Sequence, residues 1–193
     1  MKEYDVSIWI DGNVKVKGNL LKFISQYDLG TCSFWVRKHP QRDCIYDEGT
    51  ACIALHKDSK DVIDRQTAKY KSLSYPAHNG LAETNVILRK HSDLACQKLC
   101  EMWASEICFH SFRDQLSFNY ACYACRFKYG VLSHESDMTH DNDSPFFMWF
   151  RKHNQSRCHD TCFSAAMSSS DVTVAICNFN TSQLTNDCIM SIC

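Results

Sequence analysis

The spacing of hydrophobic residues divides the first three quarters of the chain into strands and helices that follow one another. Short apolar or alternating segments, rich in β-branched and aromatic side chains, predict strands at Tyr4–Ile10, Cys32–Lys38, Asn85–Arg89 and Tyr129–Ser133. Three- and four-residue spacing predicts helices after Asn19, over Asp43–Leu55 and Ser59–Ser72, from Ser92 to Ile107, and over Arg113–Arg126. Strands separated by helices are typical of an α/β fold, with a mixed sheet flanked by helices.

The last quarter of the chain has a weaker pattern. The segment His134–Pro145 is polar, with two histidines and four acidic residues, and loops of this kind commonly overhang binding sites. From about Asn154 onward Ser, Thr, Asn and Cys dominate, and only Val172–Cys177 resembles a strand. We therefore expect one domain over residues 1–153 and a Cys/Ser/Asn-rich tail over residues 154–193.

Charge and hydropathy exclude some classes of partner. The formal net charge is −1, with acidic and basic residues interspersed, which argues against a nucleic-acid partner. No apolar run reaches the roughly 18 residues of a membrane-spanning helix, and the first residues lack the apolar core of a signal peptide. These features predict a cytoplasmic protein. A peripheral position at a membrane, or the Golgi if the chain is a fragment of a longer eukaryotic protein, are the alternatives.

The chain has 13 cysteines, an odd number, and most of them lie inside helix or strand patterns. Reduced cysteines in such positions behave as small buried hydrophobic residues, so we expect free thiols. The Asn-x-Ser/Thr triplets at Asn142, Asn154 and Asn180 would then not serve glycosylation. Cys122 and Cys125 have the spacing of zinc ligands, and Cys158, His159 and Cys162 could complete such a site, although core packing is the simpler interpretation.

Polar residues gather at two predicted element ends. Asp11 and Asn13 follow the first strand, where two oxygen ligands can share a hard divalent cation; an ordinary Asp-Gly turn is the alternative. Asp114 and Gln115 begin a helix, where a carboxylate and an amide can orient sugar hydroxyl groups. A favourable charge at the helix N-terminus is the alternative for Asp114.

A compact basic segment follows the strand Cys32–Lys38. Arg42 can bind phosphate oxygens through two parallel hydrogen bonds, and Lys38 and His39 can add positive charge. A solvated loop is the alternative interpretation of this segment.

The order of these motifs resembles a known domain. The series comprises Trp9-Ile-Asp-Gly-Asn-Val, Lys38-His-Pro-x-Arg-Asp, Tyr75-Pro, Asn79-Gly-Leu-x-Glu, Val86-Ile-Leu-Arg, Trp103 and Arg113-Asp-Gln-Leu-Ser-Phe. It is similar to the glycosyltransferase-like domain shared by plant mucilage and turgor-related proteins and by many bacterial proteins. That family is related to GT-A glycosyltransferases, and the resemblance covers about Tyr4 to Asn154.

The resemblance implies a role for each candidate residue. Asp11 corresponds to the first carboxylate of an Asp-x-Asp motif that holds a divalent metal (Mn or Mg) and the donor ribose, and Asn13 replaces the second carboxylate. His134 or His140 would complete the metal site. Asn85 would line the sugar pocket, and Asp114, Gln115 and Asn119 resemble the element beside the donor sugar.

The implied activity is sugar transfer from a nucleotide-sugar donor to a glycan or other acceptor. A non-catalytic carbohydrate-binding relative is a second hypothesis, and hydrolysis of a glycolipid or ceramide-type substrate is a third. The match corresponds to the C-terminal half of a GT-A domain, so we expect the N-terminal nucleotide-binding units to be missing. A partner chain, or a second copy, would then complete the sheet. Without such a partner, the Tyr4–Ile10 strand would expose an apolar edge.

Overall fold

The structure is a computed structural model that describes residues 4–11, 14–132, 144–149 and 172–177. Its elements, in chain order, are β1 (Val6–Asp11), β2 (Val14–Val16), α1 (Leu20–Ile24), β3 (Phe34–Lys38), α2 (Ile45–Ala54), α3 (Lys60–Ser72), β4 (Ala82–Lys90), α4 (Leu94–Phe109), α5 (Gln115–Cys125), β5 (Gly130–Val131), β6 (Phe147–Trp149) and β7 (Val172–Cys177). The mixed sheet flanked by helices that the sequence predicts is confirmed.

Five of the strands form one sheet in the order β5-β3-β4-β1-β7, and β2 pairs with β6 in a separate ribbon. β4 is antiparallel to both β1 and β3, whereas β5 pairs parallel with β3 and β7 pairs parallel with β1. The ladder between β3 and β4 breaks between Val36, which faces Ile87, and Arg37, which faces Glu83. Such irregularities bend a strand and are frequent beside functional sites.

The first strand is not an edge strand, so the prediction of an exposed apolar edge is wrong. β1 lies between β4 and β7, and its pairs with β4 run from Val6 with Lys90 to Ile10 with Val86. The error has a physical reason: β7 comes from the segment assigned to the tail, and local patterning carries no information about so distant a partner. The boundary at residue 153 itself stays a prediction.

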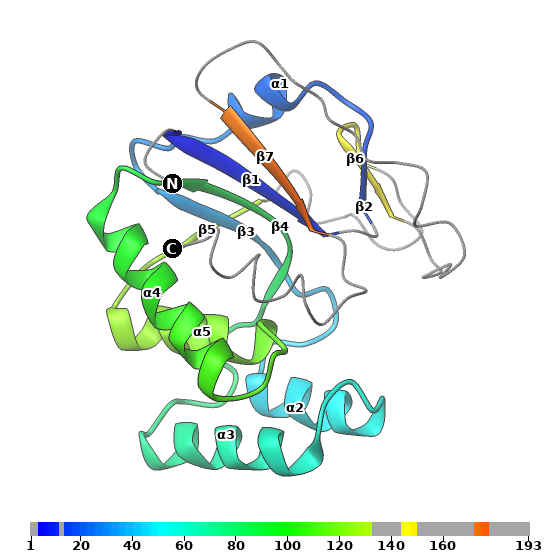
Figure 1. The fold of residues 1–193 in the computed structure, drawn as a ribbon, viewed down its shortest axis with the longest axis vertical. Coiled ribbons are helices and arrows are strands. Elements are labelled where there is room, and N and C mark those ends of the chain that lie inside the picture. Colours follow the sequence, from blue (N-terminus) through cyan, green and yellow to red (C-terminus); the bar gives the residue numbers. More distant parts are fainter. Residues whose placement is uncertain (1–3, 12–13, 133–143, 150–171, 178–193) are drawn as a thin grey trace.

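Each face of the sheet is covered by its own hydrophobic core. On one face, Ile8, Ile10 and Val86 pack with Phe23 from α1 and with Phe147. On the other face, β3 and β4 pack against α4 and α5 through Phe34, Val36, Ile87, Leu99, Trp103 and Phe118. Figure 1 shows α4 and α5 beneath the sheet and α1 above it. The central strands β1, β3 and β4 therefore pack against apolar side chains on the faces of the sheet.

A buried polar network joins α3 to α4 below the second core. The hydroxyl of Tyr70 donates to Glu106 Oε2 at 2.8 Å, and Lys69 Nζ donates to Glu106 Oε1 at 2.7 Å. Gln66 Nε2 in turn donates to the Tyr70 hydroxyl at 2.9 Å. A buried carboxylate needs partners of this kind, so the network holds the two helices in register.

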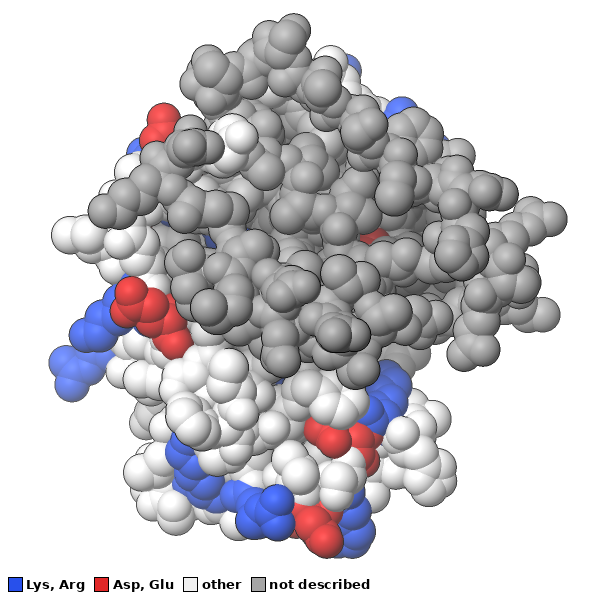
Figure 2. All heavy atoms as spheres, in the orientation of Figure 1, with Lys and Arg blue, Asp and Glu red and all other residues white. Residues whose placement is uncertain are grey.

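The described surface carries both signs of charge. In Figure 2 the Lys and Arg side chains lie close to Asp and Glu side chains over the described part of this face. Within the described residues, no helix is long and apolar enough to cross a membrane.

Candidate functional site

Asp11 is the last residue of β1 and lies at the end of the ladder that β1 forms with β4. Its Oδ1 accepts a hydrogen bond of 3.0 Å from Trp9 Nε1, which fixes the carboxyl group. Asp11 follows Ile10 in β1, and Asn85 precedes Val86 in β4. Because Ile10 pairs with Val86 in the antiparallel ladder of these strands, Asp11 and Asn85 lie beside each other at its end. Asn85 is only 7% exposed, and its Oδ1 has no hydrogen-bond partner among the described residues. Buried acceptors without a partner are rare in folded proteins, so this oxygen is a candidate contact for a ligand or a bound water.

Asp114 brings a second carboxylate to the same end of the sheet. It is the N-cap residue of α5, and its Oδ1 accepts from the backbone N–H of Gln115 at 2.9 Å. Its backbone carbonyl accepts from Trp103 Nε1 at 3.0 Å, which fastens the helix start to α4. Aspartate is among the preferred N-cap residues because its side chain satisfies a free N–H of the first turn.

The pKa of Asp11 shows that the two carboxylates interact. Burial is the main cause that raises the pKa of Asp11 from 3.8 to about 7, and the negative charge of Asp114 raises it further. The hydrogen bond from Trp9 and the positive charge of Arg113 act in the opposite direction, and Glu83 adds a smaller upward effect. The structure therefore brings together Asp11 and Asp114, which are far apart in the sequence.

Arg113 supplies positive charge near Asp11, and Arg37 pairs with Glu83, another acid whose charge acts on Asp11. Arg37 is 1% exposed and its Nη1 lies 2.6 Å from Glu83 Oε2, so the pair is largely removed from water. Arg113 has a buried Nε with no hydrogen-bond partner among the described residues. A buried donor and the buried Asn85 acceptor are suited to a polar ligand with several hydroxyl or phosphate oxygens.

Gln115 and Asn119 join α5 to the beginning of β4. Gln115 Nε2 donates to the Ala82 carbonyl at 3.2 Å, and Asn119 Oδ1 accepts from the Ala82 N–H at 2.8 Å. Asn119 Nδ2 also donates to the Tyr129 hydroxyl at 2.9 Å, so both ends of this buried amide are used. These contacts position the helix start that carries Asp114.

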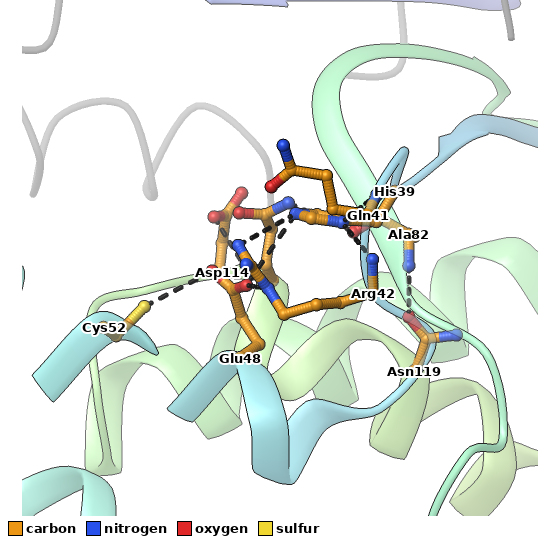
Figure 3. A network of polar contacts seen from close by, with 9 residues as sticks. His39, Gln41, Arg42, Glu48, Cys52, Ala82, Asp114 and Asn119 are labelled. Atoms are coloured by element: carbon orange, nitrogen blue, oxygen red, sulfur yellow. Dashed lines mark hydrogen bonds and ion pairs between the residues drawn. The ribbon is translucent and has the colours of Figure 1, made fainter. Parts of the chain in front are cut away.

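The basic segment lies close to the same helix start, as Figure 3 shows. His39 is 8% exposed, and its Nδ1 accepts from the backbone N–H groups of Gln41 and Arg42 at 3.2 and 3.0 Å. Burial lowers the pKa of His39, which favours the neutral imidazole. Arg42 Nε donates to the buried Glu48 at 2.5 Å, whereas Lys38 is exposed. No observation tests the phosphate contacts of Lys38, His39 and Arg42, so these contacts stay predictions.

Three of the four predicted metal ligands, Asn13, His134 and His140, lie outside the described residues. The same holds for Cys158, His159 and Cys162 of the zinc alternative, while Cys122 and Cys125 both lie on α5. Asp11 is thus the predicted metal ligand that the structure locates. Two interacting carboxylates are a suitable donor set for a hard divalent cation, because the cation relieves their repulsion.

No role is predicted for Arg37 from the sequence patterns, and Arg113 appears there only as part of a motif. A charged residue inside the apolar segment Phe34–Lys38 is the signal that could have found Arg37, because a buried arginine needs an acidic partner. The identity of that partner, Glu83, depends on the broken register between β3 and β4.

Comparison with known proteins gives one family. The family model described as TOD1/MUCI70, glycosyltransferase-like domain, matches residues 2–142, which is more than half of the 193 residues. No curated protein and no solved structure matches the chain.

Proposed function

The chain belongs to the TOD1/MUCI70 glycosyltransferase-like domain family, and we propose that it transfers a sugar from a nucleotide-sugar donor to a glycan or other acceptor. The observation that carries the proposal is the meeting of Asp11, Asn85 and Asp114 at one end of the sheet. Two of these side chains are acidic, and the third is a buried amide whose oxygen has no hydrogen-bond partner in the described part of the chain. This combination suits a ligand that has both a charged diphosphate and a hydroxyl-rich sugar.

In the proposed reaction Asp11 would hold a divalent cation, Mn²⁺ or Mg²⁺, and the cation would supply positive charge next to the nucleoside diphosphate that leaves. The raised pKa of Asp11 supports this role, because a carboxylate that is costly to ionise by itself gains most from a bound cation. Asn13 and a histidine, His134 or His140, are the further ligands proposed on the family pattern. Lys38 and Arg42 would add positive charge toward the phosphates.

The proposed sugar-binding groups are Asp114, Gln115, Asn85 and Arg113. Asp114 and Gln115 begin α5, whose attachment to β4 through Ala82 keeps them fixed before the substrate arrives. Neither Asn85 Oδ1 nor Arg113 Nε has a hydrogen-bond partner among the residues that the structure describes, so the first can accept from a sugar hydroxyl and the second can donate to one. Groups held in place in this way contribute to catalysis by orienting donor and acceptor.

Non-catalytic binding of a carbohydrate is the second candidate. It is favoured by Asn13, which stands where the related enzymes have a second carboxylate. Since an amide is a weaker ligand than a carboxylate for a hard cation, the metal would be held less tightly.

A screen for turnover distinguishes these functions. Purified protein is incubated with Mn²⁺ and each of a panel of nucleotide sugars, and release of the nucleoside diphosphate is measured. We expect one donor to be consumed by the wild type and by Asp64→Ala, which changes an exposed carboxylate on α3, but not by Asp11→Ala. Glycan binding without consumption of any donor would favour the non-catalytic function. Equal rates for wild type and Asp11→Ala would remove Asp11 from the proposed role.

A further inference from the structure

Three potential metal ligands of different chemistry lie together at the start of α2, and the proposed function uses none of them. The thiol of Cys44, a carboxylate oxygen of Asp47 and a ring nitrogen of His78 all lie within 4.8 Å of one another. Cys44 is the N-cap residue of α2, and Asp47 lies in the first turn of that helix. His78 belongs to the loop that precedes β4, so the group joins two separate parts of the chain.

A fourth side chain orients the imidazole. His78 Nδ1 lies 2.8 Å from Asp43 Oδ1, a distance at which the ring N–H donates to the carboxylate. When Nδ1 carries the proton in this way, Nε2 keeps a lone pair that can bind a metal ion. Histidine ligands of zinc commonly donate their other ring N–H to a carboxylate, because that contact fixes the tautomer and the ring orientation.

The two segments that supply the ligands are held together by other contacts. The backbone N–H of His39 donates to the Leu81 carbonyl at 2.8 Å, and the Tyr46 hydroxyl donates to the Tyr75 carbonyl at 2.7 Å. The two contacts bracket Cys44 in one segment and His78 in the other, and Asp47 follows Tyr46 directly. The ligands are thus brought together by the fold and do not depend on an ion to meet.

The thiol lies at the start of a helix and is almost fully buried. Cys44 is 3% exposed and is the N-cap residue of α2, and within the described residues its side chain makes no capping hydrogen bond. Asp47 and His78 are exposed, and their ligand atoms lie within 4.8 Å of the thiol. Ligand atoms on a tetrahedral zinc ion lie about 3.5 Å apart, so small rotations of these exposed side chains bring the set to bonding geometry.

The chemistry of the set selects the ion. A thiolate, an imidazole and a carboxylate together match zinc, whereas a thiolate is a poor ligand for magnesium, calcium and manganese, which favour oxygen donors. We propose that Cys44, Asp47 and His78 form a zinc site, with Asp43 as the residue that orients His78. The ion ties the N-terminus of α2 to the loop before β4.

The proposed site can be tested directly with zinc and with cobalt. A bond between cobalt and a thiolate gives a charge-transfer absorption band. The full-length, reduced protein is titrated with Co²⁺, and the band is compared among wild type, Cys44→Ser, Asp47→Asn and His78→Ala. Two matched controls change residues outside the group. Cys108→Ser removes an exposed thiol. His56→Ala removes an exposed imidazole at a position whose backbone is left-handed (φ 51°), as it is at His78. The chain has other cysteines, so the difference between variants and controls is the measured quantity.

We expect one equivalent of cobalt to be lost in each of the three site variants and retained in both controls. At a free zinc concentration about 100 times its Kd, zinc should raise the Tm of the wild type by about 5–10 °C and leave that of His78→Ala unchanged. Because Asp47 and His78 are exposed, their variants keep the core intact and decide the result even if Cys44→Ser folds poorly. Equal cobalt binding in wild type and the site variants, or an equal loss in the controls, would overturn the proposal.

Discussion

Asp11 is predicted to destabilise the metal-free protein at neutral and alkaline pH, so Asp11→Asn should be more stable than the wild type there. Asparagine keeps an oxygen that can accept the hydrogen bond from Trp9, but it cannot ionise. The substitution therefore removes the charge and leaves the local packing nearly unchanged.

The magnitude follows from the pKa of Asp11 in the folded chain. A rise from 3.8 to about 7 spans roughly three pKa units, and each unit is worth about 1.36 kcal/mol, which gives about 4 kcal/mol in total. Between pH 3.8 and about pH 7, Asp11 holds a proton in the folded protein that it releases in the unfolded chain. The free energy of unfolding therefore falls as the pH rises. The cost is absent below about pH 4 and fully present above about pH 7.

The assay is urea unfolding, followed by circular dichroism, at several pH values from about 4.5 to about 8 with a chelator present. The variant should be more stable than the wild type by only about 1 kcal/mol at about pH 4.5 and by about 4 kcal/mol at the alkaline end. Asp64→Asn serves as a control, because that exposed carboxylate lies on α3. Identical pH dependence in wild type and Asp11→Asn would refute the burial and charge interaction assigned to Asp11.

Three further substitutions have defined outcomes. Asp114→Asn should lower the rate of sugar transfer about 100-fold or more, yet leave the Kd of the nucleoside diphosphate unchanged in calorimetry; loss of diphosphate affinity would contradict its placement at the sugar. Asn119→Ala leaves the buried N–H of Ala82 without its 2.8 Å acceptor and should cost about 1–3 kcal/mol in urea unfolding, whereas an unchanged midpoint would show that the bond contributes nothing. Tyr70→Phe removes the donor to Glu106 and should cost about 2 kcal/mol, and a variant as stable as the wild type would contradict the role given to that network.

Local patterning predicted most of the elements. The helix after Asn19 begins where expected, because Asn19 Oδ1 accepts from the Lys22 N–H at 3.0 Å, as an N-cap residue does. The strand Val172–Cys177 also has the predicted bounds. The three-residue strand β2 was missed, since Val14–Val16 is too short to show an alternating pattern.

The relations between distant segments could not be predicted from the sequence. The partner of β1 in the tail, the broken register that pairs Arg37 with Glu83, and the interaction of Asp11 with Asp114 all depend on how the chain closes on itself. The zinc-type group is a further example: Cys44 and His78 are 34 positions apart, and no local spacing links them.

The most direct test of the proposed donor site is the location of Mn²⁺ by anomalous scattering in crystals of the protein grown with a nucleoside diphosphate. We expect an ion at about 2–2.5 Å from a carboxylate oxygen of Asp11, with the diphosphate bound to it and the end of α5 that carries Asp114 facing the position of the sugar. A nucleotide bound elsewhere, with no ion at Asp11, would contradict the proposed donor site.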